Sequence, residues 1–262
     1  MLADHTTRSI DPADYQFLPQ AIGAMPKRFP DGHVIAPHEH VRDQLIYCVK
    51  GVMRIETDLA TLTAPPDRAV YLPAGMRHSI RMHGLVEMRT LYIDPSAARR
   101  TPPTLEAVTV SSLLRELIVA LCQEPVVYEQ DSRGDLIARL IEDELARSQD
   151  YALIAPLPRD PRLQKLCASL IAAPDDRRTL EDWAPHAGAS ARTLARLFES
   201  DLGMSFRDWR RRIRIQRAIE ALDRGDPVDQ VAYGVGYRSS SAFAAAFRAV
   251  MGAPPSTFRQ DA

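Results

Sequence analysis

The spacing of apolar residues changes once along this chain, and that change limits the folds open to it. Between about residues 30 and 95, apolar residues alternate in short runs separated by glycine or proline, a pattern typical of β-strands. After Pro102-Pro103 they recur every three or four residues, as on one face of an α-helix. The chain is therefore predicted to belong to the α+β class. Its 262 residues are enough for two domains.

The strand-rich region predicts a small β-barrel or β-sandwich. Residues 45–49 and 52–57 are apolar runs on either side of Lys50-Gly51, and we expect them to form a hairpin with its turn at that glycine. Further strands are expected at residues 69–72 and 86–93.

Two amphipathic helices are expected after the strands. Their leucine-rich stripes run from Leu113 to Leu121 and from Leu136 to Leu145, with a break around residues 125–134. Such stripes either pack on the sheet as core or pair with a second copy of the chain. The sequence leaves both possibilities open, so a homodimer through this region is a prediction.

The last hundred residues contain two segments of the same form. Residues 179–190 and 228–237 each give a short helix that reaches a glycine-containing turn. A second helix is expected to follow each turn, beginning at Ser190 and near Ser239. Helix, turn and capped helix make a helix-turn-helix unit. Residues 206–222 would form a connecting helix of about 25 Å, which suits recognition helices one DNA turn apart, about 34 Å.

Positive charge is concentrated in the C-terminal region. The formal net charge of the whole chain is −1. Residues 159–262 nevertheless carry 17 Lys and Arg against 13 Asp and Glu, or +4, whereas residues 1–158 carry 16 against 21, or −5. Nearly all of these cations are arginines, whose planar guanidinium suits phosphates and guanine edges. Double-stranded DNA is therefore a candidate partner of the C-terminal region, although a solvated basic face has the same composition.

Other features of the sequence exclude whole classes of protein. No run approaches the roughly 20 apolar residues of a membrane span, and the N-terminus lacks the profile of a signal peptide. Cys48, Cys122 and Cys167 are far apart and form no CxxC pair, so they predict neither a disulfide framework nor a thiolate zinc site. We expect a cytoplasmic protein without a membrane segment.

The C-terminal region resembles the DNA-binding domain of AraC/XylS-type transcription regulators. The resemblance depends on three sets of fixed spacings: Ser190-x-Arg192-x-Leu194-x-Arg196-x-Phe198; Ala232-x-x-x-Gly236-Tyr237-x-Ser239-x-Ser241-x-Phe243-x-x-x-Phe247-Arg248; and Gly252-x-Pro254-Pro255-x-x-x-Arg259. It implies a sensor domain at residues 1–100, a helical linker and dimerisation region at 101–158, and an AraC-type DNA-binding domain at 159–262.

The resemblance also implies which residues contact DNA, because the second helix of each unit enters the major groove in that family. In the first unit these residues are Arg192, Ala195 and Arg196. In the second unit they are Arg238, Ser239, Ser240, Ser241, Ala244, Ala245 and Arg248. Arginine can form two hydrogen bonds with guanine, whereas an alanine offers only a methyl group. We therefore expect the first unit to read most of the base sequence and the second mainly to contact phosphates.

The strand-rich region resembles the cupin-type sensor domains often joined to such regulators. The first cupin motif is matched by Gly32-x5-His38-x-His40-x3-Gln44-x6-Gly51, with Gln44 where glutamate is usual. The second is matched by Pro73-x-Gly75-x-x-His78, although Asp67 and Met82 replace its outer glycine and asparagine. The resemblance implies that His38, His40, Gln44 and His78 converge on one metal. His38 and His40 are expected to alternate on one strand, so that both point to the same face.

The chemistry of these four residues leaves two interpretations open. Three imidazoles with an open position suit nickel, zinc, copper or iron(II), but an amide is a weaker ligand than a carboxylate. The alternative is an effector pocket without metal, in which the same residues line the cavity or hydrogen-bond to one another.

The predicted function is that of a sequence-specific transcription regulator, controlled by a small molecule or metal in its cupin domain, and not of an enzyme. The alternative is a metal-dependent cupin enzyme fused to a DNA-binding domain. Only the three histidines favour that alternative, because no second motif acid, nucleophile elbow or phosphate loop accompanies them. RNA polymerase is a further expected partner if the protein is an activator.

Overall fold

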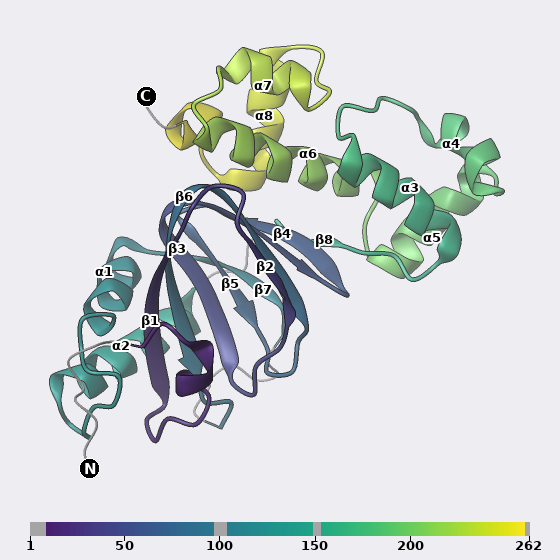
Figure 1. Cartoon of the computed structure of the whole chain (residues 1–262). Coiled ribbons are helices and arrows are strands. Elements are labelled where there is room, and N and C mark those ends of the chain that lie inside the picture. Colours follow the sequence, from purple (N-terminus) through teal and green to yellow (C-terminus); the bar gives the residue numbers. More distant parts are fainter. Residues whose placement is uncertain (1–8, 97–103, 149–152, 260–262) are drawn as a thin grey trace. The chain divides into compact units, whose positions relative to one another are not determined.

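The computed structural model describes residues 9–96, 104–148 and 153–259, which Figure 1 shows along the chain. The chain forms two compact units, the first from residues 1–55 and 64–151 and the second from residues 56–63 and 152–262. The first unit is rich in strands and the second in helices, so the predicted α+β class is confirmed. The boundary expected at residue 100 lies outside the described residues, and the boundary expected at residue 158 stays a prediction.

The first unit is built on antiparallel strands. Strand β6 pairs with β1 and with β2, and strand β5 pairs with β3 and with β7. A short 3-10 helix, η1 (Pro12–Tyr15), precedes them. The strands are β1 (Ile22–Phe29), β2 (Val34–His38), β3 (Asp43–Thr57), β5 (Arg68–Leu72), β6 (His78–Ile93) and β7 (Glu106–Thr109).

The turn expected at Lys50-Gly51 is wrong, because residues 43–57 form one long strand, β3. Gly51 has a φ of +78°, and a Cβ at this position would lie 2.8 Å from the carbonyl oxygen of Leu85. A glycine in the left-handed conformation inside a strand is typical of a β-bulge. Gly51 therefore lets the strand continue close to its neighbour where the sequence pattern predicted a reversal.

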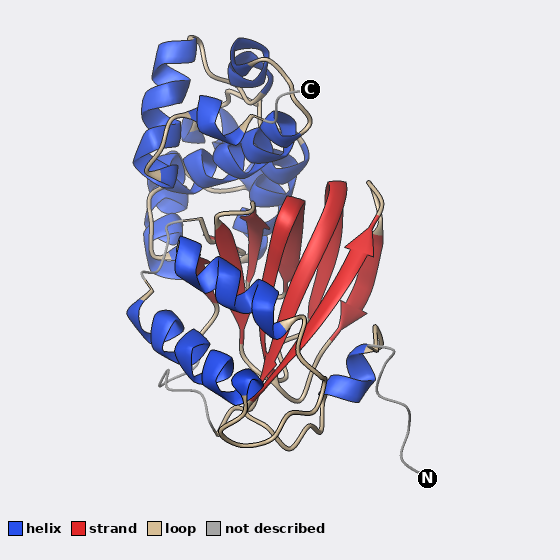
Figure 2. Cartoon of the chain, turned by 90° about the vertical axis from the view of Figure 1, so that its left-hand side faces the viewer, coloured by secondary structure: helices blue, strands red, loops and turns tan. Residues whose placement is uncertain are grey.

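Helices α1 (Ser112–Leu121) and α2 (Arg133–Arg147) cover one face of this sheet (Figure 2). Most of their apolar stripes are buried in one core with residues of β1, β3, β5 and β6. The buried members are Leu114, Leu117, Ile118, Leu121, Ile137, Ile141 and Leu145. Leu113, Leu136 and Leu140 remain about half exposed, at 55%, 52% and 50%. The stripes are therefore mainly core, with three leucines left on the surface.

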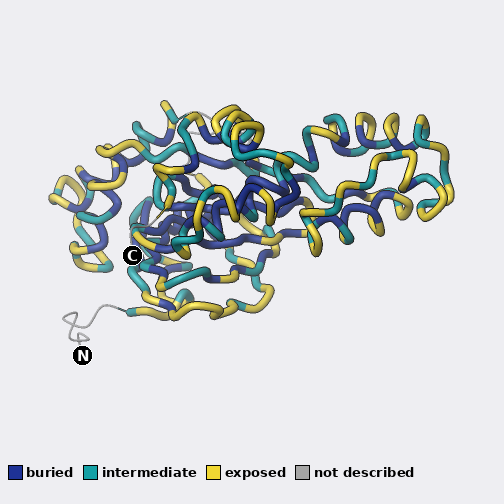
Figure 3. The backbone as a smooth tube through the Cα atoms, turned by 90° about the horizontal axis from the view of Figure 1, so that it is seen from above, coloured by how far each residue is buried: buried dark blue, intermediate teal, exposed yellow. Residues whose placement is uncertain are grey.

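The second unit is helical, and its helices bury one side and expose the other, as the alternating colours of Figure 3 show. A short strand pair accompanies the helices, in which Ala60 and Thr61 of β4 (Ala60–Ala64) face β8 (Ala155–Pro156). The helices are α3 (Pro161–Ala172), α4 (Leu180–Ala187), α5 (Ala191–Leu202), α6 (Phe206–Asp223), α7 (Val228–Gly234), α8 (Ser240–Met251) and the 3-10 helix η2 (Pro255–Phe258).

Helix α6 connects the two predicted helix-turn-helix units, as its position in the sequence indicated. Trp209 of α6 is fully buried against Phe198 of α5, with ring centroids 6.0 Å apart, and its indole N–H donates to the carbonyl oxygen of Pro156 at 2.8 Å. Around the other unit, the rings of Phe243 and Phe247 pack 5.5 Å apart in the core under α8. Each recognition helix is thus fixed by its own aromatic contacts.

Candidate functional site

The first helix-turn-helix unit consists of α4, a turn at Gly188 and α5. The Ser190 hydroxyl accepts a hydrogen bond from the backbone N–H of Thr193 at 3.1 Å, so α5 begins where the capping residue predicted. Burial of Leu194 and Phe198 fixes which face of α5 points inward. The three residues expected to contact DNA are all exposed on the rest of the helix: Arg192, Ala195 and Arg196.

The second unit consists of α7, a turn containing Gly236 and α8. Gly236 has a φ of +87°, and a Cβ there would lie 2.6 Å from the Arg214 guanidinium, so the turn requires glycine. Ser239 caps α8, since its hydroxyl accepts from the N–H of Ala242 at 3.2 Å. Of the predicted DNA-contacting residues, the exposed ones are Arg238, Ser241, Ala245 and Arg248, and the partly buried ones are Ser239, Ser240 and Ala244.

The sheet-rich unit brings three of its four predicted ligand residues together. His78 is the first residue of β6 and pairs with His38, the last residue of β2. His40 lies just beyond β2, so the expectation that His38 and His40 alternate within one strand is wrong. A bulge between Ile35 and His38 and the end of the strand at His38 change the local geometry. The cluster forms nonetheless, with one ring nitrogen of each histidine within 4.8 Å of the others.

The three imidazole rings are packed against one another. Ring centroids lie 4.3 Å apart for His38 and His78, 4.8 Å for His38 and His40, and 5.7 Å for His40 and His78. Burial lowers the pKa of His78 to about 4. Burial, with added repulsion from His38 and His78, lowers the pKa of His40 to about 4. These two imidazoles are therefore neutral near pH 7, which is the form that binds metals.

The hydrogen bonds of the cluster leave its ligand atoms free. Nδ1 of His38 lies 2.8 Å from the carbonyl oxygen of Ala36, and Nδ1 of His78 lies 2.9 Å from that of Met76. A carbonyl only accepts, so each Nδ1 carries the proton and each Nε2 keeps its lone pair. Nε2 of His40 and Nε2 of His78 are buried without a hydrogen-bond partner among the described residues. Each of these two atoms has a lone pair that can accept a hydrogen bond or bind a metal ion.

Gln44 is buried near the start of β3, and Tyr92 lies beside the cluster. The Tyr92 ring packs edge-on against His40 with centroids 5.0 Å apart. The Oε1 atom of Gln44 has no partner among the described residues. The sequence motifs did not identify Tyr92. The alternation of side chains along a strand is the signal that could have identified it. Leu91 and Ile93 lie in the core under the helices, so Tyr92 between them points to the opposite face.

Both the sheet-rich and the helical part of the chain match known protein families. Residues 28–145 match the AraC-like ligand binding domain, and residues 183–261 match a helix-turn-helix domain. The HTH-type transcriptional regulator NimR of Escherichia coli strain K12 is 30% identical over 221 residues, covering 84% of this chain and 81% of NimR. The HTH-type transcriptional regulator RipA of Corynebacterium glutamicum is 36% identical over 132 residues, covering 50% of this chain and 38% of RipA.

Among solved structures, ToxT from Vibrio cholerae aligns over 91% of this chain and 98% of its own, with 13% identity and a TM-score of 0.38. A ligand-binding unit joined to two helix-turn-helix units defines a transcription regulator that binds DNA. The chain belongs to the AraC family of these regulators. None of the helices in the described ranges is long and apolar enough to cross a membrane.

The affinity of the protein for DNA is expected to fall steeply with salt. Each phosphate that the arginines of the whole helical unit neutralise releases counterions, which gives a log–log slope of about −0.9 per contact. Several contacts predict a slope of about −4 or steeper, measured by fluorescence anisotropy of a labelled duplex between about 50 and 200 mM salt. A slope near zero would contradict phosphate contacts by this unit.

Proposed function

We propose that this regulator is controlled by a divalent transition metal held by His38, His40 and His78, and that occupancy changes its affinity for an operator. One observation carries the proposal: three imidazoles converge, and two of their Nε2 atoms are buried without a partner among the described residues. We place this activity in the cytoplasm. Double-stranded DNA is the partner of the helical unit, and RNA polymerase is a second partner if the protein activates transcription.

The donor set fits a borderline metal ion. Neutral imidazoles suit nickel, zinc, copper and iron(II), whereas magnesium and calcium prefer oxygen donors. The carbonyl oxygens of Ala36 and Met76 orient the rings of His38 and His78, as outer partners do at metal sites. Gln44 is the candidate fourth ligand because its Oε1 is buried and unpartnered among the described residues.

A small-molecule effector is the alternative occupant of the same site, and the AraC-like ligand binding domain is compatible with either kind of ligand. Such a molecule would donate hydrogen bonds to the free Nε2 atoms. A cupin enzyme would use the same three histidines. The relatives, however, are transcriptional regulators, which favours regulation over catalysis.

A metal titration tests the proposal directly. Protein purified without a polyhistidine tag and treated with chelator is titrated with nickel and with zinc in a calorimeter. We expect about one site per chain for at least one of these metals, because the ligand atoms are preformed. Less than about a tenth of an equivalent for both metals, and for copper and iron(II), would contradict a metal site and leave the organic effector.

A homodimer is expected through the exposed leucines of the sheet-rich unit, Leu113, Leu136 and Leu140. Leu117 is 9% exposed and belongs to the core, so a charge there would test stability and not association. Leu140 is 50% exposed, and Leu140→Glu should give folded monomers in sedimentation. Leu85→Glu is the matched control, since Leu85 is 52% exposed on β6, and this variant should stay dimeric. A wild-type protein that is monomeric at high micromolar concentration would contradict the prediction.

A further inference from the structure

Four arginines form a stripe along the first two turns of α6. Arg207, Arg210, Arg211 and Arg214 are spaced at i, i+3, i+4 and i+7, so they share one face of the helix. All four line one hollow in the helical unit of the chain. We call these residues the α6 arginine stripe. Only some of these arginines form hydrogen bonds or ion pairs within the helical unit.

Two members of the stripe are held by backbone carbonyls. Arg210 donates to the carbonyl oxygen of Arg178 at 2.9 Å, and its guanidinium lies 4.7 Å from the centroid of the Phe206 ring. Arg214 donates to the carbonyl oxygens of Pro174 and Asp176, both at 2.9 Å. A carbonyl oxygen carries no net charge, so these contacts fix the side chains without neutralising them.

The other two members, Arg207 and Arg211, differ in whether an ion pair within the fold uses their charge. Arg211 forms an ion pair with Asp208 on the same helix. Arg207 is exposed, and no hydrogen bond or ion pair joins it to another described residue. Arg207 is therefore the member of the stripe whose charge the fold does not use.

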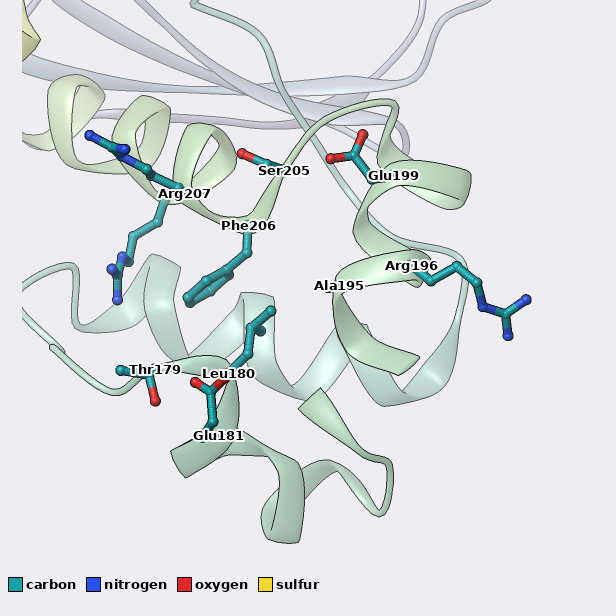
Figure 4. A pocket seen from close by; sticks show the side chains of 10 residues that line it. Thr179, Leu180, Glu181, Ala195, Arg196, Glu199, Ser205, Phe206 and Arg207 are labelled. Carbon is teal, nitrogen blue, oxygen red and sulfur yellow. The ribbon is translucent and has the colours of Figure 1, made fainter. Parts of the chain in front are cut away.

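The stripe lies between the two recognition helices. A hollow of about 510 Å³ is lined by Arg207 and Arg210 of α6 and by Ala195 and Arg196 of α5. Figure 4 labels Arg207, Ala195 and Arg196 around it, with the Arg196 side chain directed outward. A second hollow, of about 410 Å³, has the whole stripe on one side and α8 on the other, including Ala245. Arg207 and Arg210 thus line both hollows, and each hollow reaches predicted DNA-contacting residues of one recognition helix.

This placement determines which part of a duplex would face the stripe. When two recognition helices enter successive major grooves on one side of B-DNA, the intervening minor groove and its two sugar-phosphate strands face the protein between them. We propose that the α6 arginine stripe, through Arg207, binds a backbone phosphate beside this central minor groove. Arg207 would then contact DNA outside both major-groove segments and add affinity without reading bases.

The second hollow suits a DNA strand better than the first. Its charged lining residues are all arginines, whereas Glu181 and Glu199 also line the first hollow. The wall formed by α8 consists of small side chains, which leave room for a sugar-phosphate strand to approach the guanidinium groups: Ala242, Ala245, Ala246 and Ala249. Because Ala245 is also a predicted DNA-contacting residue, the hollow is continuous with the DNA interface of the family.

Substitution of Arg207 in the full-length protein tests the proposal. On an operator selected from random DNA, Arg207→Ala should bind about three- to tenfold more weakly, and its log–log salt slope should be shallower by about 1. The loss should be equal on the selected site and on single-base variants of it. Arg224→Ala is the matched control, because Arg224 follows the last residue of α6, and this variant should keep both the affinity and the salt slope.

A double-mutant cycle that pairs Arg207→Ala with modified DNA distinguishes a direct contact between Arg207 and one phosphate from a general effect of the lost positive charge. Methylphosphonates, which are neutral, replace the phosphates beside the central minor groove of the operator one at a time. At one or two positions the replacement should weaken the wild-type protein but have little further effect on Arg207→Ala. Independent losses at every position, an Arg207→Ala variant with wild-type affinity and salt slope, or a loss confined to one base pair would each overturn the proposal. None of these outcomes depends on what the histidine cluster binds.

Discussion

Replacement of His78 by alanine is expected to abolish stoichiometric metal binding by the purified protein. His78 is 2% exposed, and its Nε2 is one of the two buried, unpartnered atoms of the cluster. Removal of one of three imidazole ligands takes away a large share of the affinity, and we expect a loss of more than about 100-fold. Elemental analysis of untagged protein after incubation with nickel or zinc, followed by gel filtration, measures the bound metal.

His33→Ala is the control for this variant. His33 lies in the same unit and is exposed, and it is not part of the cluster, so its replacement should leave the metal content unchanged. Thermal melting of the metal-free proteins shows whether His78→Ala is folded. A folded His78→Ala protein that still holds about one metal per chain would place the metal elsewhere.

Replacement of Arg196 by alanine should reduce affinity for the preferred operator by about 5- to 150-fold, which corresponds to about 1–3 kcal/mol. Arg196 is exposed on α5, opposite the buried Leu194 and Phe198, where a guanidinium can reach a guanine edge. The variant should also lose its preference at one base pair, because the two hydrogen bonds to that base are gone. Binding to a panel of single-base operator variants measures both effects.

Arg248→Ala gives the contrasting pattern. Arg248 is exposed near the end of α8, and as a phosphate contact it should weaken binding to all sequences equally and flatten the salt dependence. If Arg196→Ala left both affinity and base preference unchanged, the assignment of α5 as a recognition helix would be wrong.

Features set by residues close together in the sequence could be predicted. Features that depend on contacts between distant segments could not. The caps Ser190 and Ser239 each begin a recognition helix as predicted, because N-capping is a local interaction with the next turn. The sequence predicts a hairpin turn at Gly51, although a glycine between two apolar runs fits both a turn and a bulge. The approach of Leu85 from the neighbouring strand decides between them, and it is not visible in the local sequence.

At the candidate sites, too, contacts between distant segments could not be predicted from the sequence. Motif spacing was enough to identify His38, His40 and His78, although His40 reaches the cluster from beyond the strand and not from within it. Tyr92 was missed because its contact with His40 crosses about fifty residues of sequence. The α6 arginine stripe is visible in the sequence as a basic helix, but its position between the recognition helices appears only when α5 and α8 are placed around it.

The measurement that tests the central claim most directly is the affinity for the operator with and without metal in the histidine cluster. Fluorescence anisotropy of a labelled operator is recorded for chelator-treated wild-type protein, for the same protein with one equivalent of the metal that binds, and for His78→Ala under both conditions. Metal should change the operator Kd of the wild-type protein by about tenfold, the effect of a coupling of about 1.4 kcal/mol, and should leave His78→Ala unchanged. Identical wild-type affinities in the two states, with the metal shown to be bound, would contradict regulation through this site.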